Sequence, residues 1–94
     1  MIVGVMEIDF RINDSFSLKD KRRVIKSIIE KSKRLFNISI AETDNNEMIN
    51  FGTVGLSVVS KDDGRFIEST FDKVLDFIEN NFDVEIVNVR RDFL

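Results

Sequence analysis

The fold is decided by the stretch MIVGVMEIDFRINDSFSLKDKRRVIKSIIEKSKRLF, residues 1–36. Its first twelve residues alternate, so that one side of the chain carries only apolar residues and glycine: Ile2, Gly4, Met6, Ile8, Phe10 and Ile12. A period of two over this length is typical of a strand with one face on a core. Asn13-Asp14-Ser15 is a cluster of turn formers, so the strand is predicted to end there.

An amphipathic helix is predicted after this turn. Ser17 and Asp20 have the spacing of a capping box in which Asp replaces the usual Glu, so Ser17 is expected to cap the first turn. The helix is predicted to run from about Leu18 to Phe36 and to stop near Asn37. Apolar residues recur within it at helical spacing and occupy one arc of the helical wheel: Leu18, Val24, Ile25, Ile28, Ile29, Leu35 and Phe36.

The rest of the chain adds three strands and a second helix. Strands are predicted over residues 37–43, from residue 48 or 50 to about 60, and over 84–89, with 90–94 a tail or a continuation of the last strand. A helix is predicted over 65–79, capped by Asp62 or Asp63. The order β-α-β-β-α-β with right-handed crossovers predicts one α+β domain over residues 1–94. This is a ferredoxin-like sandwich, with a four-stranded antiparallel sheet of strand order 4-1-3-2 and both helices on one face.

Composition narrows the possible chemistry. The sequence contains no Cys, His or Tyr, which removes thiolate nucleophiles, imidazole bases, and sulfur or imidazole metal sites. The acidic stretches 44–47 and 62–64 lack the ligand spacing of a calcium loop and fit turns instead. We therefore expect no catalytic site, no metal and no cofactor. The opening residues lack the basic region of a signal peptide and no apolar run approaches ~20 residues, so a cytoplasmic protein without a membrane partner is expected.

Charge is distributed unevenly along the chain. Residues 17–37 hold eight Lys or Arg and two acidic residues, a net charge of +6, so the remainder sums to −9 because the whole chain carries −3. Six basic residues fall within about 120° of the helical wheel, opposite the apolar arc: Lys19, Arg22, Arg23, Lys26, Lys33 and Arg34. A helix that needed only solubility would gain from mixed charge signs. These residues therefore predict a surface for RNA or another polyanion, with a solvated surface and an acidic protein partner as the alternatives.

Lys21 differs from these residues because it falls inside the apolar arc. Two interpretations are open. Its aliphatic stem runs along the sheet edge to water, or it forms a structural ion pair with a strand carboxylate, for which Glu42 is the candidate. A catalytic lysine would need a desolvated pocket, and no other residue indicates one.

The face of the sheet opposite the helices is predicted to be open. Ferredoxin-like RNA-binding domains stack bases on aromatic residues of this face, but here the nine Phe, unaccompanied by Trp or Tyr, are assigned mainly to the core. Only Phe51 is placed to stack a base. The other outward positions of this face favour self-association through the sheet, because several of them are small or apolar. They are Val3, Val5, Glu7, Asp9 and Arg11 in the first strand and include Thr53, Gly55, Ser57 and Val59 in the third.

Three segments together resemble one bacterial family: Ser17-Leu18-Lys19-Asp20-Lys21-Arg22, Arg34-Leu35-Phe36-Asn37-Ile38-Ser39, and Ala41-Glu42. They are similar to the YlxP-like family, domain of unknown function 503, and the likeness extends over essentially the whole chain. It implies a ferredoxin-like fold and no established activity, in a family whose genes often lie beside those for translation and ribosome maturation. The chain departs from the family at residues 47–51, where many members carry an acidic residue and a Trp-Gln pair.

These observations predict an accessory protein without catalysis that associates with RNA or the ribosome through the basic helix. The alternative is a homodimeric structural or regulatory module that associates through the open sheet face.

Overall fold

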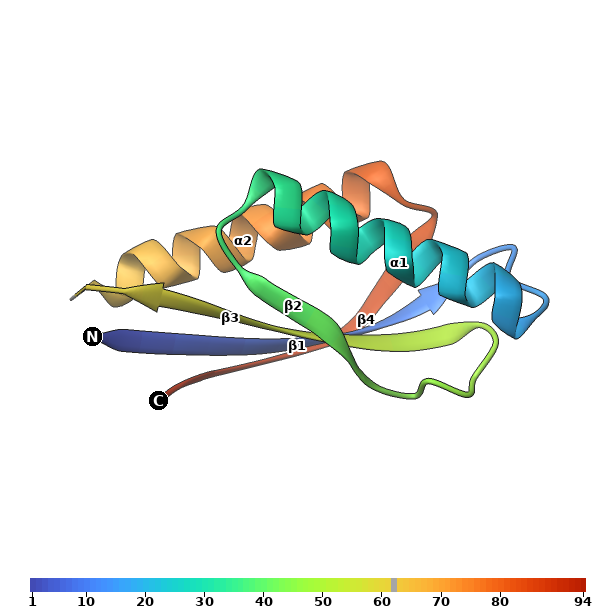
Figure 1. Ribbon diagram of the computed structural model, residues 1–94, viewed down its shortest axis with the longest axis horizontal. Coiled ribbons are helices and arrows are strands. Elements are labelled where there is room, and N and C mark those ends of the chain that lie inside the picture. Colours follow the sequence, from blue (N-terminus) through green and yellow to red (C-terminus); the bar gives the residue numbers. More distant parts are fainter. Residues whose placement is uncertain (62) are drawn as a thin grey trace.

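The computed structural model describes residues 1–61 and 63–94 as a four-stranded antiparallel sheet covered on one face by two helices (Figure 1). The elements follow the predicted order, and their bounds are β1 (Ile2–Ile12), α1 (Leu18–Leu35), β2 (Ser39–Asp44), β3 (Phe51–Ser60), α2 (Gly64–Asn81) and β4 (Val84–Phe93). The sheet order is β2-β3-β1-β4. The predicted fold class and strand order are therefore confirmed.

The core lies between the sheet and the helices. In β1, Met6, Ile8, Phe10 and Ile12 are buried, as the alternation predicts, while the residues between them lie on the open face. The helices contribute one apolar stripe each, and the buried apolar residues from these helices are Ile25, Ile28, Ile67, Phe71, Val74 and Ile78. None of the helices in the described part of the chain is long and apolar enough to cross a membrane.

Both helices begin at the predicted type of cap. The Ser17 hydroxyl accepts a hydrogen bond from the Asp20 amide at 3.1 Å, and the Asp20 carboxylate accepts one from the Phe16 amide at 3.1 Å. This capping box therefore closes on the residue before the N-cap. In α2, Asp63 caps the helix by accepting from the Arg65 amide at 2.8 Å, and the other candidate, Asp62, lies outside the described residues.

Several boundaries differ from the predicted ones by one or two residues, among them both ends of β2 and the start of α2. Helix α1 ends at Leu35, because Phe36 has extended backbone angles and serves as its C-cap. Helix α2 continues to Asn81. Strand β4 continues through residues 90–93, for which the sequence predicts either a tail or a continuation of the strand. Its last residues pair with the first half of β1, down to the partners Gly4 and Phe93.

A β-bulge in β4 decides which side its two arginines take. Asn88 pairs with Asp9 and Ile86 with Phe10, so Val87 is an extra residue in β4. Ile86 packs toward the core before the bulge and Val89 after it, which places Arg90 on the open face and Arg91 on the helix side. Arg91 accordingly pairs with Glu68 and with Asp72 of α2, the latter at 2.9 Å.

Candidate nucleic-acid interface

The basic residues of α1 remain exposed in the folded domain. Helix α1 lies across β2 and β3, with its buried stripe facing the sheet. The outer side carries all six residues of the predicted basic surface, and each is exposed: Lys19, Arg22, Arg23, Lys26, Lys33 and Arg34. Within the described residues, only Lys26 of these six forms an ion pair, with Glu30 at 4.0 Å. The positive charges of α1 are therefore largely available to a partner.

The helix end supplies a structural reason for part of this charge. Lys33 and Arg34 lie in the last turn of α1, where cations interact favourably with the helix dipole. This reason does not extend to Arg22 and Arg23, which lie near the positive end of the dipole. Their charges need a different explanation.

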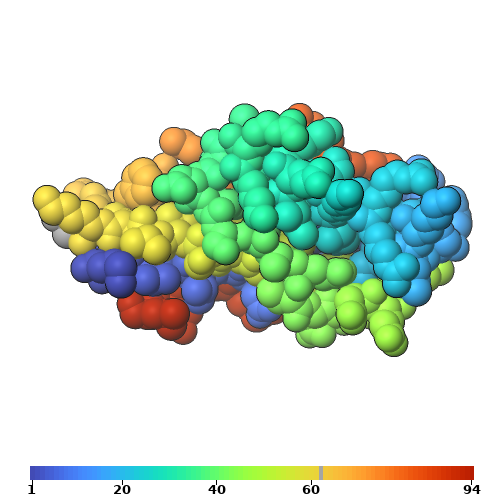
Figure 2. Space-filling view, in the orientation of Figure 1, coloured from blue at the N-terminus to red at the C-terminus, as the bar shows by residue number. Residues whose placement is uncertain are grey.

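Two shallow grooves flank α1. The groove toward β2 has a volume of about 420 Å³ and gathers three of the basic residues, Arg22, Lys26 and Lys33, around Ile25 and Ile29, with Glu30 and Glu42 also in its lining. Figure 2 views the molecule with α1 and β2 toward the reader, and its surface on this side is hollowed only slightly. Residues 22, 26 and 33 therefore share one side of the helix, as their positions on the wheel predict.

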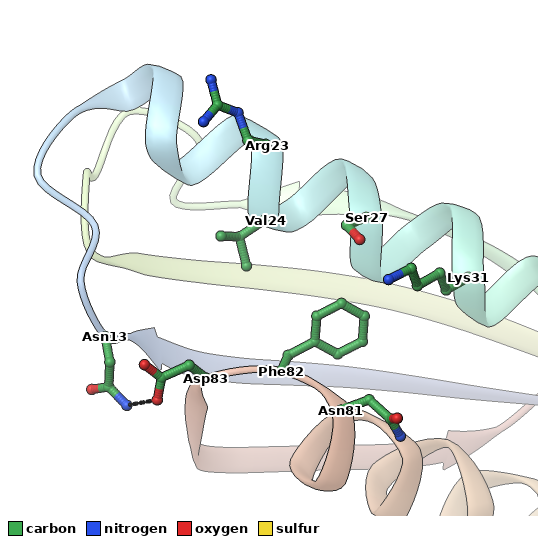
Figure 3. A pocket seen from close by; sticks show the side chains of 8 residues that line it. All are labelled: Asn13, Arg23, Val24, Ser27, Lys31, Asn81, Phe82 and Asp83. Atoms are coloured by element: carbon green, nitrogen blue, oxygen red, sulfur yellow. Dashed lines mark hydrogen bonds between the residues drawn. The ribbon is translucent and has the colours of Figure 1, made fainter.

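The second groove lies between α1 and the end of α2 and has a volume of about 330 Å³ (Figure 3). Phe82 rises between the two helices, and the Lys31 ammonium sits 5.6 Å from the centre of its ring. Below it, the Asn13 amide donates to the Asp83 carboxylate at 2.9 Å. Arg23 lies at the rim, and its guanidinium points away from Phe82. The lining therefore contains both positive and negative side chains, and the Phe82 ring is already in contact with the Lys31 ammonium.

Lys21 is buried beneath the β2–β3 loop. Its side chain is 1% exposed, and its ammonium lies 3.1 Å from the Glu42 carboxylate and donates a hydrogen bond to the Asn45 carbonyl. The ammonium does not reach water, so the interpretation in which Lys21 extends along the sheet edge is wrong. The fold brings Lys21 and Glu42 together as predicted. That this ion pair stabilises the domain stays a prediction.

A chain of polar contacts continues from Asn45 through the sheet to its open face. The Asn45 amide donates to the Thr53 hydroxyl at 2.8 Å, and Thr53 donates to Asp9 at 2.7 Å. Arg90 donates to the same carboxylate at 2.6 Å, and this hydrogen bond is the main reason that the pKa of Asp9 lies below its usual value of 3.8. This network cannot be read from the sequence pattern, because it depends on the bulge that brings Arg90 to the open face.

The open face is divided into an apolar part and a charged part. Toward the β1 start and the β3 end, the outward residues Val3 and Val5 lie beside Val59, which is 58% exposed. The rest of the face is charged, with ion pairs from Arg90 to Glu7 and Asp9 and from Arg11 to Glu85: the last is 2.9 Å long. Any self-association through this face must therefore use its apolar end.

Three phenylalanines lie at the surface, contrary to their assignment to the core. Phe16 is 80% exposed, Phe66 57% and Phe93 41%, whereas Phe51, the one aromatic residue predicted to be available to a base, is half-buried. The sequence does contain a signal that Phe16 is exposed. The residue lies between the turn cluster 13–15 and the helix cap Ser17, outside the apolar patterns of both β1 and α1. Within the described residues, no group of three or more acidic side chains is placed to hold a metal ion.

Comparison with known proteins identifies relatives of unknown activity. Residues 3–91 match the family described as "Protein of unknown function (DUF503)". The sequence is 31% identical to "Uncharacterized protein YlxP" of Bacillus subtilis (strain 168) over 84 residues, which cover 89% of this chain and 90% of that protein.

The fold is similar to those of two solved structures. The "De novo designed protein Foldit4" has a TM-score of 0.60 and 25% identity, with 96% of each chain covered. A dimeric ferredoxin-like protein from an uncultured marine organism has a TM-score of 0.51 and 6% identity, with 100% of this chain and 96% of that chain covered. The second likeness concerns the fold alone.

Proposed function

This chain belongs to the DUF503 family of proteins of unknown function, and we propose that it is a non-enzymatic accessory protein that binds RNA through the basic face of α1. The contact is made with phosphate groups, and ribosomal RNA is the first RNA to test. Phosphate contacts position a protein on RNA without reading its sequence. They require exposed cations rather than a pocket.

One observation carries this proposal: six exposed basic side chains share the outer side of α1 while a single one of them is paired with an acid in the described part of the chain. The contrast with the rest of the protein supports it. Outside residues 17–37 the net charge is −9, and the described arginines of β4 are held in ion pairs. A chain with overall negative charge that concentrates unpaired cations on one helix has an anionic partner as its simplest explanation.

The proposal is tested with a charge-reversal variant of the groove beside β2. Arg22, Lys26 and Lys33 are changed together to Glu. All three are exposed, so the fold should persist. Binding of the parent protein to ribosomal RNA should weaken linearly in the logarithm of salt concentration, with a slope of roughly 0.7 to 0.9 per phosphate engaged. The variant should lose the affinity and the slope.

A matched control separates local from overall charge. Changing Lys61, Arg65 and Lys73 to Glu also takes the net charge from −3 to −9, since each substitution removes two units, but it does so around α2. This control should bind as the parent does. Equal loss in both variants, or a parent without salt-dependent binding, would contradict the proposal.

The second candidate function is that of a homodimeric structural or regulatory module. It is favoured by the apolar end of the open face, where Val59 is 58% exposed and Leu94 79%, because exposed apolar patches on small domains mark association sites. The marine ferredoxin-like protein of similar fold is described as dimeric. The two candidates are compatible, since α1 lies on the opposite side of the sheet.

A further inference from the structure

We propose that Phe16 stacks on an unpaired base, so that the RNA bound at α1 is single-stranded where it passes the N-terminal end of this helix. This inference rests on the proposed function and names the class of RNA. It assigns a role to a side chain that the phosphate contacts leave unused.

The exposure of Phe16 is the first supporting observation. The side chain is 80% exposed, although burying an aromatic ring of this size would stabilise the fold by about 2 kcal/mol or more. The exposed ring has no role in the capping box, because only the backbone amide of Phe16 takes part by donating to Asp20. A ring kept in water beside a charged helix fits a contact with a partner.

The backbone around Phe16 is held in place on both sides. Ser15, the preceding residue, is buried and its hydroxyl donates to the Ile49 carbonyl of the β2–β3 loop. Ser17, the following residue, is fixed as the N-cap of α1. In Figure 1 the β1–α1 and β2–β3 loops meet at the same end of the molecule. The ring therefore projects from an anchored backbone, which lowers the entropy lost when a base stacks on it.

The neighbouring charges select nucleic acid over an apolar partner. Lys19 lies in the first turn of α1, and Arg22 and Arg23 follow within about one further turn, all exposed. Two acidic residues lie near Phe16 in the sequence: Asp20, whose carboxylate accepts a hydrogen bond from the Phe16 amide, and Asp14, which is exposed in the β1–α1 loop. Exposed basic residues still outnumber them on the first two turns of α1. Aromatic rings beside a basic track are the arrangement by which proteins hold single strands, because cations engage the backbone while bases stack. In a duplex the bases are already stacked on each other and would not reach Phe16.

The chain offers a direct optical test because it contains no Trp and no Tyr. Phe16→Trp introduces a single indole at the proposed contact, and Phe66→Trp places one at an exposed position in the first turn of α2, at the other end of the molecule. The probe is a single-stranded RNA of mixed sequence and about ten nucleotides, a length within the span of single-strand binding sites, compared with its duplex. The single strand should quench the indole at position 16 and leave that at position 66 unchanged, and the duplex should quench neither.

Affinity measurements on Phe16→Ala and Phe16→Leu complete the test. Both should weaken single-strand binding about tenfold, equivalent to about 1.4 kcal/mol and within the range for one stacked base, and both should leave the salt slope of the parent unchanged. Leucine keeps the apolar bulk, so undiminished binding by Phe16→Leu would overturn stacking. Parent-like binding by both variants, or equal quenching at positions 16 and 66, would also overturn the inference while leaving the phosphate contacts of α1 standing. A parent without salt-dependent RNA binding would remove both proposals.

Discussion

Lys21 Nζ lies 3.1 Å from Glu42 Oε2 with its side chain 1% exposed, so the first full turn of α1 is joined to the edge strand β2 by a buried cation. The same ammonium donates to the Asn45 carbonyl, which adds the β2–β3 loop to this junction. The residues by which the chain resembles its family include Ser17, Asp20, Lys21 and Glu42, and in the structure these cap α1 and tie it to the sheet.

The junction predicts energetic coupling between Lys21 and Glu42. In a double-mutant cycle with Lys21→Met and Glu42→Gln, the coupling energy in the free energy of unfolding should exceed about 0.5 kcal/mol, because each single change leaves a charge without its partner. Urea denaturation of the four proteins measures it. Additive single effects would mean that the Asn45 carbonyl alone satisfies the ammonium.

The N-cap of α1 gives a second prediction. Ser17→Ala removes the acceptor of the Asp20 amide, so the free energy of unfolding should fall by about 1 kcal/mol. Ser17→Asp, which can accept the same hydrogen bond, should retain most of the stability. A denaturation midpoint and slope unchanged in Ser17→Ala would show that this hydrogen bond does not stabilise the domain.

Asp9 predicts a pH-dependent contribution to stability. Its hydrogen bond from Arg90 lowers its pKa in the folded state below the usual 3.8, so the folded protein holds the charged form more strongly than the unfolded chain does. The resulting stabilisation is present above the unfolded pKa and is lost as pH falls through the folded pKa. The parent should therefore exceed Asp9→Asn in stability at pH 6, and the difference should shrink toward pH 2. A stability difference that stays constant from pH 6 to pH 2 would show that the effect of the substitution does not come from loss of the Asp9–Arg90 ion pair.

The second candidate function predicts that a charge at the apolar end of the open face prevents dimer formation. If two copies associate there, Val5→Lys places a charge in the contact, and sedimentation should give monomers where the parent gives dimers. Leu35→Lys is the matched control, since Leu35 is 61% exposed at the end of α1, on the helix side of the sheet, and it should leave the dimer intact. A parent that is monomeric at high concentration removes this function outright.

Element types and their order could be predicted because each element carries a local signal. The alternation in β1 and the three-to-four spacing of Ile25, Ile28 and Ile29 are properties of neighbouring residues, and the caps at Ser17 and Asp63 are visible in the sequence. The strand order then follows from connectivity rules rather than from individual side chains.

The features that could not be predicted depend on contacts distant in the sequence. The bulge at Val87 has no signal of its own in the strand pattern, yet it sends Arg90 to the open face. Asn45 takes part in the Lys21 junction through its carbonyl, in a residue with φ of 57°, and a backbone acceptor cannot be inferred from residue type. Composition predicts that Phe16 belongs to the core with the other phenylalanines, because residue type alone does not distinguish a buried ring from an exposed one.

The placement of β4 beside β1 has a consequence for how the domain is made. Gly4 pairs with Phe93, 89 residues further along the chain (93 − 4), and β1 is an inner strand with β3 on its other side. A nascent chain can therefore assemble β1, β2 and β3 while one flank of β1 remains an open edge until Val84–Phe93 emerges from the ribosome. Closure of so distant a pair is slow relative to local folding, and an unpaired inner strand is prone to wrong pairing with other chains. Pairing of the ten-residue strand β4 is thus the step that covers this flank of β1.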